Sequence, residues 1–436
     1  MAQRMHPYLR RRRNFFVVAV LSTTLSNSHA ERPVLPESLD VEQAVQIALR
    51  DNPDVLLARL AVDAARAAVQ TAGATPNPQL TVGLAGFNPA VGIGSGNLRS
   101  KTVDSSVRID QLIERGSKKS LRMQNAAALR AAAQYDAQET RRLLGVAVRQ
   151  AFYDLLGAQW RTQITAQSAA LAEATVAAAR KRQKAGDMAP SDVSRLLVDA
   201  LRSENDLTQA RADALRARLV MLQLLGHADQ AAAITATGEW APSEQGLERD
   251  VDVLVAQRAD VRAALARLEA ARAASRVALA ARTRDVSVGV QYDHYPSSVA
   301  NTQGGGNTFG IAIQIPLFIG NQFDGEIRSA LLAVDSAEET VAKTRGAARN
   351  EVLRLLADQR SSSERLLRFN EQLLPAAKKS ADAAEFAFAH GAIAIMDVLD
   401  VRRTNRLVQL DALAAQVEQA KLAASFQTVP EPKELP

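Results

Sequence analysis

The chain has 436 residues and no cysteine, which excludes disulfide bonds, thiolate metal sites and a lipid anchor on an N-terminal cysteine. It carries 53 lysine and arginine side chains against 47 aspartate and glutamate side chains, a formal net charge of +6. Five arginines lie in residues 1–30, which hold no acidic residue, so 53 less 5 leaves 48 basic against 47 acidic side chains elsewhere, a net charge of +1. This near-neutral remainder does not indicate a nucleic acid partner.

Residues 1–30 have the pattern of a secretory signal peptide. The basic run Arg10–Arg13 precedes the apolar run Phe15–Leu21, and Ser28 and Ala30 are small residues at the −3 and −1 positions of a cut after residue 30. The apolar run is too short to span a bilayer. We therefore expect export, by the general route or by the twin-arginine route, since the paired arginines also approach the twin-arginine motif.

The remaining chain contains an internal repeat with a period near 205 residues. Three segments of the first copy recur in the same order in the second: Asp51–Val55 as Gln257–Val261, Leu80–Leu84 as Val286–Val290, and Gly186–Val193 as Gly391–Val398. We interpret the chain as a tandem duplication. The first structural repeat is assigned to residues 31–240, the second to 241–426, and a C-terminal tail to 427–436.

Each copy is predicted to contain a helix, a strand pair and two long helices joined by a turn at Gly186 or Gly391. The predicted helices are about 38–72, 118–185 and 191–225 in the first copy, and about 247–282, 323–389 and a return helix to about 425 in the second. Alanine, leucine, arginine and glutamine dominate the long helices, as in coiled coils. Pro375 interrupts the second copy's first long helix, so we predict a kink or break there.

Each copy also contains two segments in which apolar and polar side chains alternate, the period of a strand with two unlike faces. The apolar positions are Leu80, Val82 and Leu84; Val103, Val107 and Ile109; Val286, Val288, Val290 and Tyr292; and Ile311, Ile313, Ile315 and Leu317. Loops rich in glycine, asparagine and serine separate them at 87–101 and 294–306. The polar positions are expected to face the lumen of a pore, through Asp104, Arg108, Asp110, Gln291 and Gln314.

The strands favour a membrane pore over a soluble sheet. Each has about nine residues, enough to cross a bilayer when tilted, and aromatic side chains lie near the strand ends, as at a lipid interface. Four strands cannot close a barrel and open edges are excluded from lipid, so three copies would have to supply twelve strands. The alternative of another class is a non-conducting periplasmic coiled-coil protein with a small β-domain.

The duplicated layout resembles the TolC-like outer-membrane efflux family across the whole chain after residue 30. The segments that carry the resemblance are Pro76–Leu80 before the first strand, Pro316–Phe318 after the last strand, and the two turns, of which Gly391–Asp400 is the more specific. The resemblance implies a mainly α-helical fold with a small β part. It also implies a homotrimer whose twelve-stranded barrel crosses the outer membrane of a Gram-negative bacterium, with an α-helical tunnel through the periplasm.

Site residues and protein partners follow from the same resemblance. It implies an acidic ring at the periplasmic aperture, which here corresponds to Asp397 and Asp400, and docking to an inner-membrane resistance-nodulation-division pump through a periplasmic adaptor. The tip residues expected to contact the adaptor are Gly186, Asp192, Val193, Gly391 and Val398. A helix cap is an equal alternative for Asp397. The family's closed gate uses an arginine where this chain has Ile393, so its closing contacts do not carry over.

The segment Gln111–Lys119 resembles the corresponding segment of cobalt-zinc-cadmium efflux channels, which implies divalent heavy-metal cations as the exported substrate. Multidrug export and type I protein secretion are alternatives with the same fold. The mature histidines His227, His294 and His390 are scattered, so no metal site or cofactor is predicted. No nucleophile–base pair is present, and Gly304–Gly306 lacks the Lys-Ser/Thr of a phosphate loop, so we expect no enzymatic activity.

Overall fold

The computed structural model describes residues 35–86, 103–230, 233–240, 250–296 and 305–427. The predicted signal peptide, nearly all of the tail and most of the two strand-connecting loops lie outside these ranges. The chain divides into two units, Met1–Pro36 and Glu37–Pro436, and the second contains every helix and strand below. Within the described residues, no helix is long and apolar enough to cross a membrane.

The prediction of one helix over 38–72 is wrong, because the segment holds a short strand and two helices. Strand β1 is Ser38–Leu39, α1 is Val41–Asp51 and α2 is Pro53–Ala72. Asp40 starts α1 with a capping box, since its carboxylate accepts from the backbone N–H of Gln43 while the Gln43 side chain accepts from the backbone N–H of Asp40. The break at Asn52 is extended (φ −70°, ψ 129°), as expected for a residue before proline.

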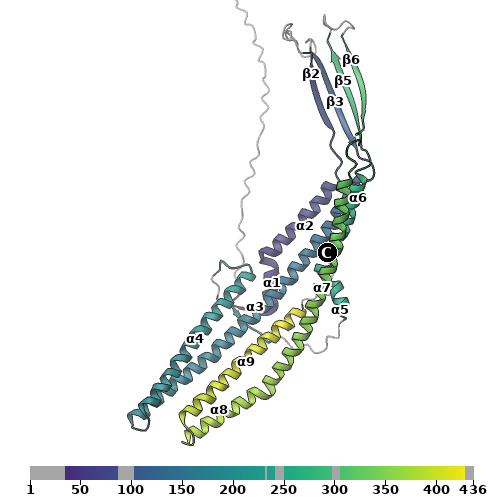
Figure 1. Ribbon diagram of the computed structural model, residues 1–436. Helices are drawn as coiled ribbons and strands as arrows, with labels where there is room; N and C mark the ends of the chain where they lie inside the picture. Colours follow the sequence, from purple (N-terminus) through teal and green to yellow (C-terminus); the bar gives the residue numbers. More distant parts are fainter. Residues whose placement is uncertain (1–34, 87–102, 231–232, 241–249, 297–304, 428–436) are drawn as a thin grey trace, which may run out of the picture. The chain divides into compact units, whose positions relative to one another are not determined.

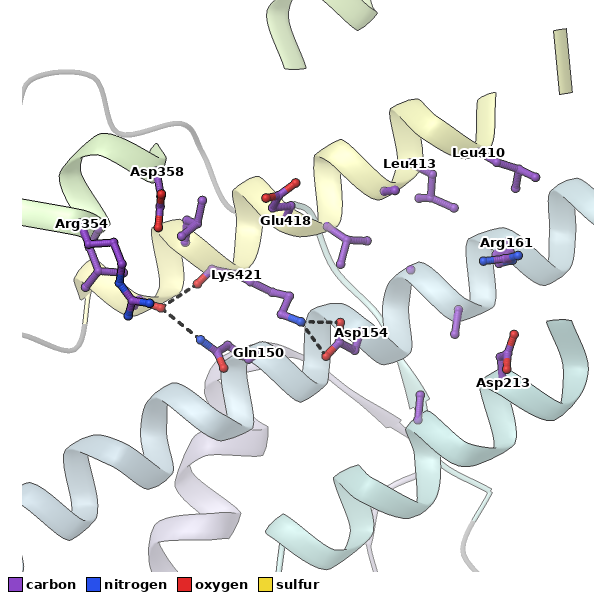
Figure 2. A pocket seen from close by; sticks show the side chains of 18 residues that line it. Gln150, Asp154, Arg161, Asp213, Arg354, Asp358, Leu410, Leu413, Glu418 and Lys421 are labelled. Atoms are coloured by element: carbon purple, nitrogen blue, oxygen red, sulfur yellow. Dashed lines mark hydrogen bonds and ion pairs between the residues drawn. The ribbon is translucent and has the colours of Figure 1, made fainter. Parts of the chain in front are cut away.

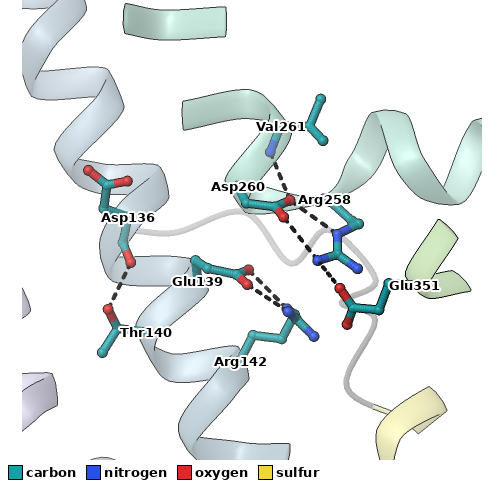
Figure 3. A network of polar contacts seen from close by, with 8 residues as sticks. All are labelled: Asp136, Glu139, Thr140, Arg142, Arg258, Asp260, Val261 and Glu351. Carbon is teal, nitrogen blue, oxygen red and sulfur yellow. Dashed lines mark hydrogen bonds and ion pairs between the residues drawn. The ribbon is translucent and has the colours of Figure 1, made fainter. Parts of the chain in front are cut away.

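The second copy breaks at the matching place. Helix α5 is Val251–Gln257 and α6 is Ala259–Ala280, with extended backbone at Arg258 (φ −63°, ψ 138°), 206 residues after Asn52. The residue directly after Arg258 is Ala259 and not a proline. The break is instead held by its guanidinium, which bonds to Asp260 and Glu351 (Figure 3).

Four antiparallel strands form the main sheet in the order β2-β3-β5-β6. Their bounds are Gln79–Ala85 for β2, Asp104–Ile113 for β3, Val286–Tyr295 for β5 and Gly306–Gln314 for β6. Three predicted strand positions fall outside: Val103 precedes β3 and is buried, while Ile315 and Leu317 follow β6. The alternation of apolar and polar residues continues past the strand ends at these positions. A strand ends where its hydrogen bonding to a neighbouring strand ends, and the alternation does not show this. A separate parallel pair joins β1 to β4 (Thr235–Ala236).

The long helices are close to their predicted ranges. Their bounds are α3 Lys118–Lys184, α4 Pro190–Leu224, α7 Asp324–Arg368, α8 Leu374–Ala389 and α9 Ile395–Gln427. The predicted break at Pro375 is confirmed: a π-helical turn, Phe369–Leu373, separates α7 from α8. Proline lacks an N–H and clashes with the preceding turn, so the helix widens before it. The 67-residue α3 is about 100 Å long.

Contacts between helices link the two copies into one row. Helix α3 packs against α2 and α6 near the sheet and against α4 and α9 farther away, while α7 packs against α6 and α9 (Figure 1). Among the described residues, the largest fully buried side chain is Phe152 of α3, a helix that also contacts α1. Ser117 and Phe323, the residues that precede α3 and α7, share a left-handed backbone (φ 56° and 63°) and lie 206 positions apart.

Candidate functional site

The four-stranded sheet has one apolar and one polar face, because opposed residues in an antiparallel pair share a face. Its register places Arg108 opposite Gln291, Asp110 opposite Gly289, and Gln314 opposite Ser287. Asp104 lies two residues before Ser106, hence on the same face. All five predicted lumen residues therefore share one face, as the alternation indicated.

The polar face holds a bonded charge pair on β3. Arg108 donates to Asp110 through Nε and Nη2, both at 2.8 Å, and the pair lies over Gly289 of β5. A Cβ at residue 289 would overlap the Asp110 carboxylate, so the glycine provides the space for the pair. Asp293 accepts from Gln291 Nε2 at 2.7 Å. With Asp104, the face has three carboxylates and one guanidinium, which favours cations over anions.

The apolar face is exposed in the single chain. Phe309 and Ile311 are each 80% exposed, Ile313 67%, and Leu80 and Val82 65%. Soluble proteins rarely expose contiguous apolar patches this strongly, so the face requires an apolar neighbour. The outer edges of β2 and β6 pair with no described strand, which leaves backbone donors and acceptors available for another chain.

The segment Gln111–Lys119 forms a charged clamp where the sheet meets the helices. Lys118 Nζ lies 2.8 Å from Asp285, whose carboxylate also accepts from the backbone N–H of Arg115 at 2.9 Å. Burial raises the pKa of Asp285, but these hydrogen bonds outweigh it and lower the pKa below its ordinary value. Hydrogen bonds from Arg122 likewise lower the pKa of Glu114. The segment that suggested a metal substrate thus joins β3 and α3 to the turn before β5.

The hairpins α3–α4 and α8–α9 pack together near their turns, at the ends of the long helices that lie away from the sheet (Figure 1). Gly186 and Gly391 turn them with left-handed backbone (φ 83° and 73°), and both glycines are exposed. Val176 and Leu196 from the first hairpin pack with Leu399 from the second in one buried cluster. Asp192 is partly exposed.

Two of the predicted adaptor contacts, Val193 and Val398, are buried in the single chain. Val193 belongs to the buried cluster between the hairpins, and Val398 is 1% exposed. Val193 packs in the cluster that joins the two hairpins. The sequence placed both residues near the tip, but the burial of Val193 follows from its packing with Ile395 and Leu399 of the second hairpin.

Asp397 and Asp400, the predicted aperture residues, are both exposed on the first turns of α9. The Asp397 carboxylate accepts from the backbone N–H of Ala394, the residue before α9, at 3.3 Å, which is the contact that the third helical residue makes in a capping box. Asp397 therefore satisfies the backbone donor of Ala394 at the start of α9 from a position inside the helix. Ile393 is half-buried beside them.

A cleft of about 710 Å³ lies among α3, α4, α7 and α9 (Figure 2). Lys421 from α9 bonds to Asp154 from α3 at 2.9 Å, and Gln150 lies 3.2 Å from Ser425. Arg161, Arg354, Asp213 and Asp358 give its wall both signs of charge. No group of three or more histidine or acidic side chains suited to a metal ion occurs in the described part of the chain.

Two polar centres carried no signal in the sequence. Burial lowers the pKa of Arg258, but bonds to Asp260 and Glu351, both 2.9 Å away, raise it further than burial lowers it (Figure 3). His227 is fully buried, with Nε2 3.0 Å from Asp51 Oδ2. A hydrogen bond from Arg50, with a smaller one from His227, lowers the pKa of Asp51 to about 2. Both centres join segments distant in the chain, so spacing could not reveal them.

The sequence is similar to those of known proteins. Residues 44–227 and 251–427 match a family model described as outer membrane efflux protein. The cobalt-zinc-cadmium resistance protein CzcC of Cupriavidus metallidurans is 27% identical over 390 residues, covering 85% of this chain and 86% of CzcC.

Solved structures agree with the fold. The channel CusC superposes with a TM-score of 0.74 at 19% identity, covering 89% of this chain and 91% of CusC. The outer membrane protein VceC of Vibrio cholerae superposes with a TM-score of 0.68 at 20% identity, covering 89% and 95%. At these identities the likeness concerns the fold alone.

Proposed function

Because this chain belongs to the outer membrane efflux protein family, we propose that it is the outer-membrane channel of a tripartite efflux system for divalent heavy-metal cations. The observation that carries the substrate class is the similarity to a cobalt-zinc-cadmium resistance protein along 85% of the chain. The acidic balance of the sheet's polar face supports a cation pathway. The protein acts as a passive conduit and not as an enzyme.

The exposed apolar face and the two open sheet edges support assembly in the outer membrane. Three copies joined β6 to β2 would close a twelve-stranded barrel, which satisfies every edge hydrogen bond and turns the apolar face to lipid. The five lumen residues would then line the pore. The long helices continue the conduit into the periplasm, towards an adaptor and an inner-membrane resistance-nodulation-division pump.

The hairpin tips are the proposed docking end. Gly186, Asp192 and Gly391 are the surface positions for the adaptor, with Val193 and Val398 as the buried support beneath them. Six exposed carboxylates, from Asp397 and Asp400 of three copies, would form the aperture ring and favour cations.

Deletion of the gene tests the substrate. We expect reduced growth on zinc, cobalt, cadmium or copper, restored by a plasmid copy, with unchanged growth on hydrophobic antibiotics. Unchanged growth on all four metals, in a strain without a second such channel, would contradict the metal assignment. Antibiotic sensitivity would instead favour multidrug export, and loss of a secreted polypeptide would favour protein secretion.

Bilayer recordings test the channel itself. Purified protein in planar bilayers is expected to give single-channel currents with cation preference. A protein that gives no current and stays in the periplasmic fraction is the structural coiled-coil alternative.

A further inference from the structure

The turns of the hairpins α3–α4 and α8–α9 have the same backbone. The N–H of Gly186 donates to the carbonyl of Gln183, and the N–H of Gly391 donates to the carbonyl of Phe388, each at 3.0 Å. A shift of 205 residues carries the first of these bonds onto the second. Both glycines have left-handed backbone, as is common where a helix ends. The two turns therefore differ in their side chains and not in their fold.

The side chains around the two turns carry opposite charge. Residues 176–200, which we call the first tip, hold five basic and three acidic side chains, a net charge of +2. Residues 381–405, the second tip, are the same segment after the shift and hold two basic and four acidic side chains, a net charge of −2. Arg195, which is exposed, corresponds to the exposed Asp400. A partner that binds both tips therefore meets two electrostatically unlike surfaces.

The positive charge of the first tip is concentrated at the end of α3. Four exposed basic side chains lie within the last five residues of this helix, and they are Arg180, Lys181, Arg182 and Lys184. Within the part of the chain that the structure describes, none of these four side chains forms a hydrogen bond or an ion pair. By contrast, both arginines of the second tip, Arg402 and Arg403, bond to carboxylates, at 3.0 and 2.8 Å. The cations at the end of α3 are thus available to a partner.

The end of a helix does not by itself account for this cluster. The carbonyl end of a helix favours positive charge, which gives basic side chains there a stabilising role. Helix α8 ends at the equivalent turn without a basic residue in its last turn, so the turn forms without them. Arg180 and Lys184 are four positions apart, where like charges repel each other along the helix. Cations that repel each other and are not needed for the turn point to a negative charge outside the chain.

We propose that the first tip is a cationic docking surface for an acidic segment of the periplasmic adaptor. The proposal rests on the proposed function, in which the adaptor is the partner at this end of the channel. Complementary charges across an interface speed association and discriminate against wrong partners. The second tip has Phe386 and Ala389 where the first has Lys181 and Lys184, so it does not offer the same site. The adaptor therefore presents different surfaces to the two hairpins.

The length of α3 separates the first tip from the anionic headgroups of the outer membrane. Helix α3 starts five residues after β3 and ends at the first tip, and its 67 residues extend for about 100 Å. With the sheet in the membrane, as proposed, this length is roughly ten times the Debye length at physiological salt. Charges of that membrane therefore do not act on the tip, and the occupant is a protein that reaches it from the periplasm.

Site-specific photocrosslinking in living cells tests this docking surface in the full-length channel. The photoreactive residue benzoylphenylalanine takes the place of Ala185, which is exposed beside Lys184. We expect an adduct whose linked peptide, identified by mass spectrometry, belongs to another periplasmic protein and has more acidic than basic residues. Adding Lys181→Glu with Lys184→Glu should lower the adduct yield about tenfold, because like charges across an interface repel.

The matched control is Lys378→Glu with Lys379→Glu, which makes the same change of charge on exposed residues of α8. These lysines lie about 15 Å of helix before the second turn, beyond the Debye length of about 8 Å. The adduct yield should then stay within about twofold of that without them. Native gels of outer-membrane extracts should show equal amounts of trimer for both variants. If the first variant assembles poorly, Lys181→Gln with Lys184→Gln replaces it, with a smaller loss expected.

Each other outcome has a defined meaning. An adduct yield that the Lys181 and Lys184 variants leave unchanged would overturn the docking surface, and so would trimers that give no adduct. A linked peptide from this chain, a peptide with a basic excess, or an adduct to cell-wall glycan would also overturn it. The expected adduct in a strain whose metal tolerance does not depend on the channel would overturn the metal assignment alone. Absence of trimers and of single-channel currents would instead overturn the proposed function.

Discussion

The hydrogen bond between Asp51 and His227 gives the most specific prediction about stability. Asp51 ends α1, and His227 follows α4, 176 residues later, so their bond ties the short first helices to the end of the first hairpin. Beside it, Asn52 Nδ2 donates to the backbone carbonyl of Leu224 at 2.8 Å. We consider the variant Asp51→Ala.

Two arguments give the magnitude. Removing the carboxylate leaves a fully buried imidazole N–H without an acceptor, which costs about 1–3 kcal/mol. The pKa of Asp51, lowered from 3.8 to about 2, corresponds to about 2.4 kcal/mol in favour of the folded state at neutral pH. Because Arg50, the main cause, is exposed, solvent screening reduces that value. We expect about 2 kcal/mol.

Hydrogen exchange followed by mass spectrometry measures this loss of stability locally. A loss of 2 kcal/mol is expected to speed exchange about 30-fold in peptides that cover the end of α1 and the end of α4. Asp63→Ala, which removes an exposed ion pair with Arg66 on the next helix, should leave the same peptides unchanged. Exchange in Asp51→Ala within twofold of wild type would refute the reasoning.

The pH dependence has a defined sign. A lowered folded-state pKa means that the Asp51 contribution is complete above pH 3.8 and is lost as the pH falls through 3.8 towards about 2. The difference between wild type and Asp51→Ala, compared at equal pH, should therefore shrink across that window. A constant difference from pH 6 to pH 2 would show that the carboxylate charge is irrelevant.

Three further outcomes are expected. Asp397→Ala should speed amide exchange at the start of α9 about fivefold, a loss of about 1 kcal/mol, since the N–H of Ala394 loses its acceptor. Asp397→Asn keeps an acceptor oxygen and should lower only the cation preference in bilayer recordings; equal effects of both variants would contradict this. Gly289→Val should displace the Asp110 carboxylate and change single-channel conductance without changing trimer mass. Phe152→Ala should lower the free energy of unfolding by about 3–5 kcal/mol in denaturant melts, because the ring is 1% exposed.

Sequence reasoning performed best where structure depends on near neighbours in the chain. The alternation along Val286–Tyr292 predicted the two faces of β5, and Pro375 predicted the break now seen as a π-helical turn. It missed the break at Asn52, where the alanine- and leucine-rich pattern continues across a proline that can also begin a helix. It also ran strands past Gln314, because alternation does not report where pairing ends.

Residue periodicity by itself predicted the local structure of this chain: two copies, two strand faces and two long hairpins with glycine turns. Burial was decided only by the tertiary structure. Val193 is a core residue because the second hairpin packs on it, and His227 is a buried partner of Asp51, which lies 176 residues away in the chain. Periodicity records which side of a helix is apolar, whereas the element that lies across from that side depends on packing between distant segments.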